Sequence, residues 1–248
     1  MSGIVYIVSA PSGSGKSTLT AELLKSVPNL EFSISYTTRG PRGSEQNGRE
    51  YFFVTPEEFQ RMLAEDEFLE HACVFGDYYG TARRFLRDAK ARGNDLLLDI
   101  DVQGAGQVKR KLPDAVSIFI LPPSRDELEK RLRCRSEGEK EVEDPGRRRT
   151  EADREATIQR RLRAAAKEIE NYPNYDYILV NDQLEQSIDL LKGIVLAERL
   201  RRSGRALSAE DAKLVSAAEL CRLPRCGQRV QQILSTFMQP AAPGSRAK

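Results

Sequence analysis

Residues 4–18 read Ile4-Val5-Tyr6-Ile7-Val8-Ser9-Ala10-Pro11-Ser12-Gly13-Ser14-Gly15-Lys16-Ser17-Thr18. An apolar run, a glycine-rich turn and a lysine followed by hydroxyl residues stand in the order of a phosphate-binding loop. Gly13 and Gly15 let the backbone curl so that successive N–H groups point at phosphate oxygens. Lys16 adds a positive charge, and the Ser17 hydroxyl can bind Mg²⁺. A helix beginning near Ser17 would direct its positive end at the same anion.

One position departs from the usual loop, because Ala10 stands where the first glycine is common. A small residue suffices there. The alternative interpretation is a Gly/Ser-rich turn with a chance lysine, and the correct order of strand, loop and helix signals argues against it. We expect a nucleoside triphosphate to be held by Ala10, Pro11, Ser12, Gly13, Ser14, Gly15, Lys16, Ser17 and Thr18.

Composition limits the function classes. The chain has 248 residues, of which 31% are charged, with a formal net charge of +2, so no overall preference for nucleic acid is indicated. No apolar run approaches the roughly 18–20 residues of a membrane span. The apolar run at residues 4–8 is too short for a signal peptide. The four scattered cysteines contain no CxxC pair and indicate free thiols in a reducing cytoplasm.

Short apolar runs alternate with helical segments, which predicts an α/β core with a doubly wound parallel sheet and helices on both faces. Helices are predicted over residues 18–26, from Ser124 with Glu127 as a capping box, and over residues 184–202. The expected strands are Ile4–Ser9, Leu96–Ile100, Ser117–Leu121 and Tyr177–Val180.

Residues 33–81 differ in character and predict an inserted, mostly antiparallel lobe. Turn signals separate four β-type pieces at residues 33–38, 51–54, 68–75 and 78–81. One helix interrupts them, with Thr55 as its cap, Pro56 in its first position and Glu58 reaching back to the cap.

The remaining segments are a charged stretch and a C-terminal extension. Residues 131–163 are rich in both charges, and we expect their centre, residues 136–150, to be solvated and mobile. Residues 203–248 carry two helix patterns, at residues 207–220 and 228–237, before a tail that we expect to be disordered. A loosely attached helical appendage is favoured over packing on the core, a contact with another subunit or weak RNA binding.

A second group of candidate binding residues lies in the inserted lobe. Arg39 and Arg42 stand three apart around a Gly-Pro turn, and two guanidinium groups can clamp one phosphate. Glu70 ends an apolar stretch, and a tyrosine and Thr81 follow on a turn. Taken singly, these are also compatible with surface charges and a solvated strand-end carboxylate.

The ordered set of motifs closely resembles guanylate kinase, from Ile4 to about Leu200. The matching segments are the phosphate loop, Ser33-Ile34-Ser35-Tyr36-Thr37-Thr38-Arg39-Gly40-Pro41-Arg42, Phe68-Leu69-Glu70, Tyr78-Tyr79-Gly80-Thr81, Leu98-Asp99-Ile100-Asp101-Val102-Gln103-Gly104 and Tyr175-Asp176-Tyr177 with Asn181-Asp182. The resemblance implies a P-loop core of residues 1–32, 82–130 and 164–202. It also implies a GMP-binding lobe at 33–81 and a helical lid at 131–163, the lid carrying an insertion at 136–154.

The resemblance implies a role for each residue. Asn181 would contact the ATP adenine, and Ser17 and Asp99 would support Mg²⁺, partly through water. Thr81 would bind the guanine base beside Gly80, and Asp101 would face the nucleotide. Glu70 would accept hydrogen bonds from the N1–H and amino group of guanine, which adenine cannot offer. The GMP phosphate would be held by Ser35, Arg39, Arg42, Tyr51 and Tyr79. The catalytic set would be Lys16, Arg39, Arg131, Arg135 and Arg161, with Arg160 as the competitor of Arg161.

The implied activity is Mg²⁺-dependent transfer of a phosphoryl group from ATP to GMP, and also to dGMP, with no membrane and no specific nucleic-acid partner. The oligomeric state stays open, a homo-oligomer included. Two rival functions remain. A guanylate-kinase-like module that binds a phosphorylated peptide would have a damaged phosphate loop, whereas Gly15, Lys16 and Ser17 are intact. A kinase for a phosphorylated sugar would need neither Glu70 nor Thr81.

Overall fold

A five-stranded parallel sheet forms the centre of the computed structural model, which describes residues 3–74, 76–140 and 150–238. All four strand pairings are parallel. The predicted doubly wound sheet is confirmed, and only its edge strand, Leu30–Phe32, was missed, because three residues are too few to show a periodicity. The strands follow the order β2 (Leu30–Phe32), β7 (Asp95–Asp99), β1 (Val5–Ser9), β8 (Val116–Leu121) and β9 (Tyr177–Val180).

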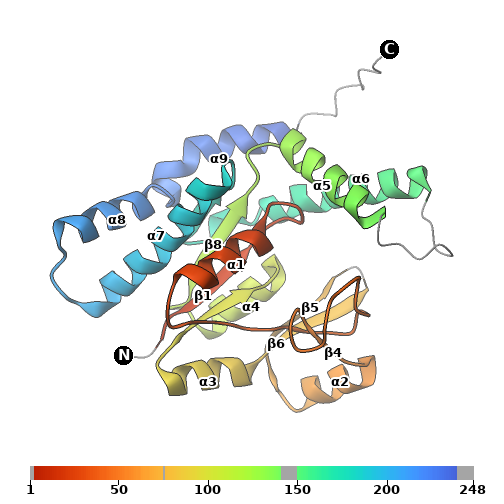
Figure 1. Cartoon of the computed structure of the whole chain (residues 1–248), viewed down its shortest axis with the longest axis horizontal. Coiled ribbons are helices and arrows are strands. Elements are labelled where there is room, and N and C mark those ends of the chain that lie inside the picture. The colour runs from red at the N-terminus through yellow and green to blue at the C-terminus, as the bar shows by residue number, and fades with distance from the viewer. Residues whose placement is uncertain (1–2, 75, 141–149, 239–248) are drawn as a thin grey trace.

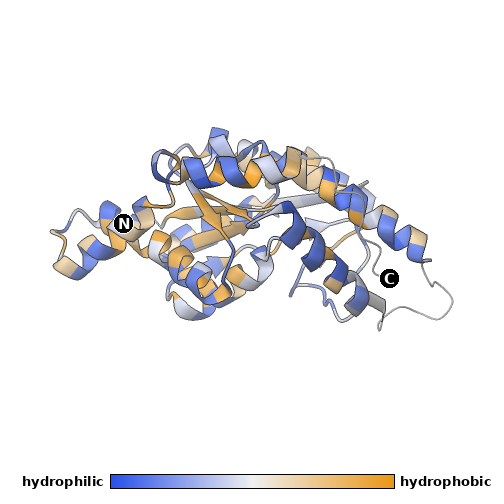
Figure 2. Ribbon diagram, turned by 90° about the horizontal axis from the view of Figure 1, so that it is seen from above, coloured by the Kyte–Doolittle hydropathy of each residue, from blue (hydrophilic) through white to orange (hydrophobic). Residues whose placement is uncertain are grey.

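Helices cover both faces of this sheet (Figure 1). One face is covered by α1 (Lys16–Ser26) and α7 (Leu184–Ser203), with α8 (Ala209–Glu219) beside α7. The other face is covered by α3 (Arg83–Arg92), α4 (Val102–Lys111) and α9 (Leu223–Met238). Figure 2 shows the resulting apolar interior between polar outer surfaces. Burial on both faces explains why these strands read as continuous apolar runs.

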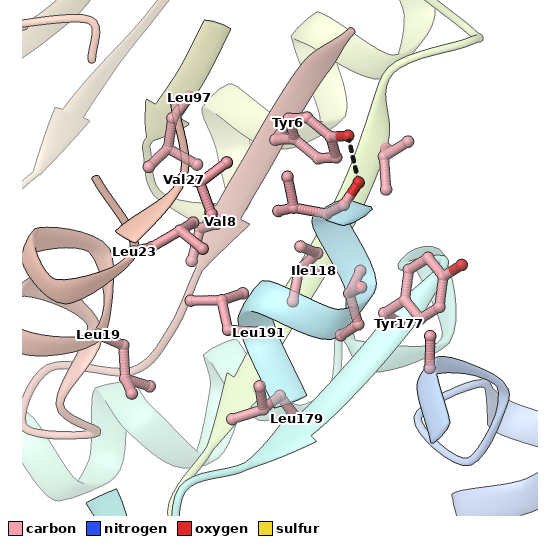
Figure 3. Close-up of a cluster of buried hydrophobic side chains, with 14 of the residues drawn as sticks. Tyr6, Val8, Leu19, Leu23, Val27, Leu97, Ile118, Tyr177, Leu179 and Leu191 are labelled. Carbon is pink, nitrogen blue, oxygen red and sulfur yellow. Dashed lines mark hydrogen bonds between the residues drawn. The ribbon is translucent and has the colours of Figure 1, made fainter. Parts of the chain in front are cut away.

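The core beneath α1 and α7 ties the sheet to its helices (Figure 3). Leu19 and Leu23 of α1 and Leu191 of α7 are fully buried against the sheet. The Tyr6 hydroxyl donates a hydrogen bond of 3.0 Å to the carbonyl of Val195. Because both groups are buried, this bond satisfies a tyrosine hydroxyl that could not reach water.

The inserted lobe is a second sheet, with the strand order β4 (Phe52–Phe53), β3 (Tyr36–Thr37), β6 (Asp77–Ala82) and β5 (Phe68–Val74). Two of its pairings are antiparallel and the β3–β4 pairing is parallel, which fits the predicted mostly antiparallel lobe. The Thr55 cap accepts from the Glu58 backbone N–H, as predicted, but the Glu58 carboxylate contacts Arg61 instead of the cap. The predicted helix is α2 (Pro56–Ala64), which connects β4 to β5.

The segment expected to form the lid, for which we keep that name, is a pair of helices, α5 (Arg125–Lys140) and α6 (Glu151–Ile169), followed by a 3₁₀ turn at Tyr172–Asn174. The Ser124 hydroxyl caps α5 by accepting from the Glu127 N–H at 3.1 Å. The prediction of a mobile segment from residue 136 was wrong for residues 136–140, which continue α5. Thr150, at the end of the predicted segment, caps α6, and residues 141–149 lie outside the described residues. The lid cluster, as we call the apolar side chains between the two helices, consists of Leu128, Leu132, Ile158, Leu162 and Ala165.

The C-terminal extension packs on the core, so the favoured interpretation as a loose appendage was wrong for its helices. Ala218 and Cys221 join the core on the α7 side. Val230 and Ile233 of α9 are buried on the other side. The reason is that α9 has a complete apolar stripe, which must be covered to be stable in water. Residues 239–248, where the predicted tail lies, are outside the described residues. In the described ranges no helix combines the length and apolarity that a membrane span requires.

Candidate active site

A cavity of about 1220 Å³ lies where the core, the inserted lobe and the lid meet. It gathers predicted residues that stand far apart in the sequence. Ser17 and Asp99 come from the core, and Arg135 comes from the lid. Both candidates for the further lid arginine, Arg160 and Arg161, line it as well. The lobe contributes Ser35, Arg39, Arg42, Tyr51 and Tyr79.

The phosphate loop between β1 and α1 depends on its glycines. Gly13 and Gly15 have φ values of 93° and 87°, which a residue with a side chain rarely adopts. A Cβ at Gly13 would lie 2.9 Å from Leu132 Cδ2 and 3.0 Å from Leu128 Cδ1 of the lid cluster. A Cβ at Gly15 would lie 2.3 Å from Asn181 Nδ2. The loop is therefore packed directly against α5 and the end of β9.

An ion pair joins the phosphate loop to the neighbouring strand. Lys16 Nζ contacts Asp99 Oδ1, because β1 and β7 are parallel and both end at this edge of the sheet. Burial alone would lower the pKa of Lys16, but the negative charge of Asp99 outweighs it and raises that pKa. Lys16 is thus cationic at neutral pH and positioned beside a carboxylate.

Asn181 and Arg131 lie beside the loop rather than on the cavity wall. Asn181 is buried, and its Nδ2 donates to the Ser14 carbonyl at 2.8 Å. Arg131 donates from Nη2 to the Asn181 carbonyl at 3.1 Å and from Nε to Glu127 at 3.0 Å. Both residues therefore brace the phosphate loop in this conformation.

In the lobe, Arg39 is fixed by Glu45, a partner that was not predicted from the sequence. Its guanidinium donates to both carboxylate oxygens of Glu45, at 2.8 and 3.1 Å, and to the Tyr79 hydroxyl at 3.3 Å. It also lies 5.0 Å from the ring centroid of Tyr51. Arg42 is exposed, and its backbone N–H donates to Glu45 at 2.8 Å. The glutamate three residues after Arg42 was visible in the sequence, but nothing there showed that it would hold Arg39.

Glu70, Gly80, Thr81 and Asp101 do not line the cavity. Glu70 is 3% exposed and faces Thr81 across the β5–β6 pair. Thr81 lies two residues from Tyr79 on β6 and so shares its face of the sheet. Burial raises the pKa of Glu70 to about 7, and nearby Asp101 adds to the effect. The buried Thr81 hydroxyl has no hydrogen-bond partner of normal geometry in the described structure.

Gly104 makes room for Glu70, a role that was not predicted from the sequence. A Cβ on Gly104 would lie 2.3 Å from Glu70 Oε2. The Gly104 backbone N–H donates to Asp101 Oδ1 at 2.8 Å, so Asp101 caps α4. The helix thereby brings its first turn against the buried carboxylate of Glu70.

The donor set fits Mg²⁺ that is held mainly by phosphate and water. Ser17 and Asp99 line the same cavity and offer a hydroxyl and a carboxylate oxygen, the ligands this ion prefers. Among the described residues no three His, Cys, Asp or Glu side chains group as a metal site.

Comparison with known proteins identifies the family. The sequence model of the guanylate kinase family matches residues 2–198. The chain belongs to the guanylate kinase family. The guanylate kinase of Koribacter versatilis is 60% identical over 243 residues, covering 98% of this chain and 99% of the relative. The guanylate kinase of Escherichia coli K12 is 48% identical over 203 residues, covering 81% and 91%.

A solved member of the guanylate kinase family supports the fold. The crystal structure of guanylate kinase from Anaplasma phagocytophilum is 35% identical, covers 79% of this chain and 86% of its own, and gives a TM-score of 0.62. The family match ends at residue 198, so α8 and α9 lie beyond it.

The raised pKa of Glu70 predicts a pH-dependent stability. An acid with a raised folded-state pKa favours folding below its unfolded pKa, and this benefit is lost as the pH rises through about 7. The Glu70→Gln variant does not ionise. Its free energy of unfolding relative to wild type should therefore rise by about 2–3 kcal/mol between about pH 4.5 and pH 8. Urea unfolding at both pH values measures this, and an unchanged difference would contradict a buried, shifted carboxyl.

Proposed function

We propose that this cleft transfers the terminal phosphoryl group of ATP to GMP, giving ADP and GDP. The chain is a nucleoside monophosphate kinase of the guanylate kinase family. The observation that carries the proposal is that Ser17 and Asp99 of the phosphate loop side line one cavity with Arg39 and Arg42 of the lobe. Two anion-binding groups that share one cavity can bring a donor and an acceptor phosphate together.

On the ATP side, the backbone of residues 10–18 and the Lys16 ammonium group would hold the triphosphate. Ser17 and Asp99 would hold Mg²⁺, which when bound neutralises negative charge on the phosphate oxygens. Asn181 supports the same site from the other side, because its amide fixes the Ser14 carbonyl. We propose that Asn181 keeps this contact with the phosphate loop when it also contacts the adenine.

On the GMP side, Arg39 and Arg42 would bind the phosphate together with the hydroxyl groups of Ser35, Tyr51 and Tyr79. The Glu45 carboxylate holds Arg39 in place before substrate arrives, so less side-chain freedom is lost on binding. The local charge also favours a phosphate, because the two positive charges of Arg39 and Arg42 outnumber the one negative charge of Glu45 that contacts both residues.

Guanine would be read by Glu70 and Thr81 beside Gly80 and Asp101. The Glu70 carboxylate and the Thr81 hydroxyl are both buried and face each other, and a base with suitable donors and acceptors would complete their hydrogen bonding. GMP offers the N1–H and amino donors, whereas AMP would leave Glu70 unpaired. We infer that this difference supplies most of the selectivity.

In the lid, Arg135 and Arg161 would neutralise charge on the moving phosphoryl group, with Arg131 at the base of α5. Arg160 and Arg161 both line the cavity, so both are candidates for this step.

Transfer needs no covalent nucleophile, because positioning and charge neutralisation are sufficient. The intact Lys16–Asp99 pair supports an enzyme over a peptide-binding module. We also propose that the protein works in the cytoplasm, and its free cysteines support this.

The acceptor profile tests the proposed function. ADP formation should be fast with GMP, measurable with dGMP, and weak with AMP, UMP and CMP. Glu70→Ala should lower kcat/KM for GMP by roughly 10²-fold and narrow the preference for GMP over AMP, because the base loses its carboxylate partner. Glu65→Ala, an exposed carboxylate on the lobe, is the matched control. Full GMP activity in Glu70→Ala would contradict the assignment, and absence of any turnover in the wild type would reject the function.

Two glycines of α4 provide a second, matched test. Gly104→Ala should raise the KM for GMP roughly tenfold and leave the KM for ATP unchanged, because the added Cβ displaces Glu70. Gly106→Ala is the control, since its Cβ would meet only Arg110 Nη1, at 3.6 Å. Both variants gain helix propensity, so a loss confined to Gly104→Ala cannot come from helix unfolding. Equal GMP kinetics in the two variants would show that Glu70 does not depend on this space.

A further inference from the structure

The C-terminal helix α9 lies outside the family match and yet reaches the lid. In Figure 1 it runs from the end of α8 across the molecule to the start of α5. Its middle is anchored by Val230, which is fully buried in the core against the sheet. Its last turn reaches a different neighbourhood, since Phe237 packs both on that core and on the lid cluster.

Polar contacts from α9 reach both ends of the lid. The Thr236 hydroxyl accepts a hydrogen bond of 3.0 Å from the backbone N–H of Arg125, the first residue of α5. This N–H is one of the donors that a helix start leaves without a partner inside the helix. Gln231 Nε2 donates to the Tyr172 hydroxyl at 2.8 Å, in the 3₁₀ turn just after α6. One helix of the extension therefore holds the residues where the lid leaves and rejoins the core.

The base of α5 in turn touches the phosphate loop. Leu128 and Leu132 are fully buried, and they are the residues that a Cβ on Gly13 would meet. They belong to the lid cluster on which Phe237 packs. A continuous set of contacts thus runs from Phe237 through the lid cluster to Gly13.

We propose that Phe237 and Thr236 are positioning residues for phosphoryl transfer, acting through α5 on the phosphate loop and on Arg131. The inference rests on the proposed function, because it assigns ATP to that loop. Docking of α9 holds α5 in place from its start to Leu132. Lid motion is thereby confined to the rest of α5 and the part of α6 that packs beside it. The base of the lid then stays seated on the loop while the arginines further along close over the substrates.

The inference predicts an effect on ATP but not on GMP. Phe237→Ala should raise the KM for ATP about tenfold, the change that about 1.4 kcal/mol of lost stabilisation gives, and should lower kcat. The KM for GMP should stay within about twofold, since α9 packs mainly on α5 and β9 rather than on the lobe. Gln232→Ala, on the exposed face of the same helix, is the control.

Hydrogen exchange of the unliganded protein separates this inference from the proposed function. Amides of residues 125–132 should exchange faster in Phe237→Ala, while those of β5 and β6 should not change. Thr236→Val should reproduce the kinetic effect more weakly, and Thr236→Ser should restore wild-type behaviour because it keeps the acceptor. These milder variants decide the question if Phe237→Ala fails to fold.

Several outcomes would overturn the inference. A lower melting temperature with unchanged exchange at 125–132 and unchanged KM for ATP would make α9 merely structural. A parallel rise in the KM for GMP would show general loosening. If the wild type makes no GDP, the proposed function fails, while exchange at residues 125–132 still tests the docking of α9 on the lid.

Discussion

Parallel pairing of β1 with β7 is the constraint on which the site depends. It ends both strands at the same edge of the sheet, so that the loop after β1 and Asp99 at the end of β7 must meet. The Lys16–Asp99 ion pair is the direct consequence. A parallel sheet needs crossovers on its faces, and the connection from β2 to β7 contains the whole inserted lobe. The lobe therefore lies beside the edge of the sheet at which β1 and β7 end, and its Arg39 and Arg42 line the same cavity as Ser17 of the phosphate loop.

The two halves of the cleft are prepared for anions in different ways. The phosphate loop uses backbone N–H groups freed by glycine, at positions where a side chain would strike Asn181 or Leu132. The lobe uses side chains, with Arg39 clamped by Glu45 and stacked near Tyr51. The guanine-reading region adds a third device, a buried carboxylate in a space that exists only because residue 104 is glycine. In each case the fold orders the binding groups before the substrate binds, so that less conformational entropy is lost on binding.

Much of this could be predicted from the sequence, for physical reasons that differ between segments. The strands at residues 5–9 and 116–121 are buried on both faces, so their apolar runs are unmistakable. The strand at 30–32 is too short to give a pattern. For α9, an apolar stripe indicates that a face is buried but not which surface buries it, and that surface joins residues over 100 positions away, as Thr236 and Arg125 do. The Arg39–Glu45 clamp was missed because contacts within a loop depend on backbone turns that composition does not specify.

Binding of a single molecule that joins adenosine to guanosine through a chain of phosphates tests the central claim most directly. Two anion sites in one cavity predict that such a molecule binds one to one and competes with both ATP and GMP. It should bind roughly 10²-fold or more tightly than either nucleotide alone, because the second site is then engaged without a separate loss of freedom. Competition with only one of the two nucleotides, at the affinity of that nucleotide alone, would contradict the account.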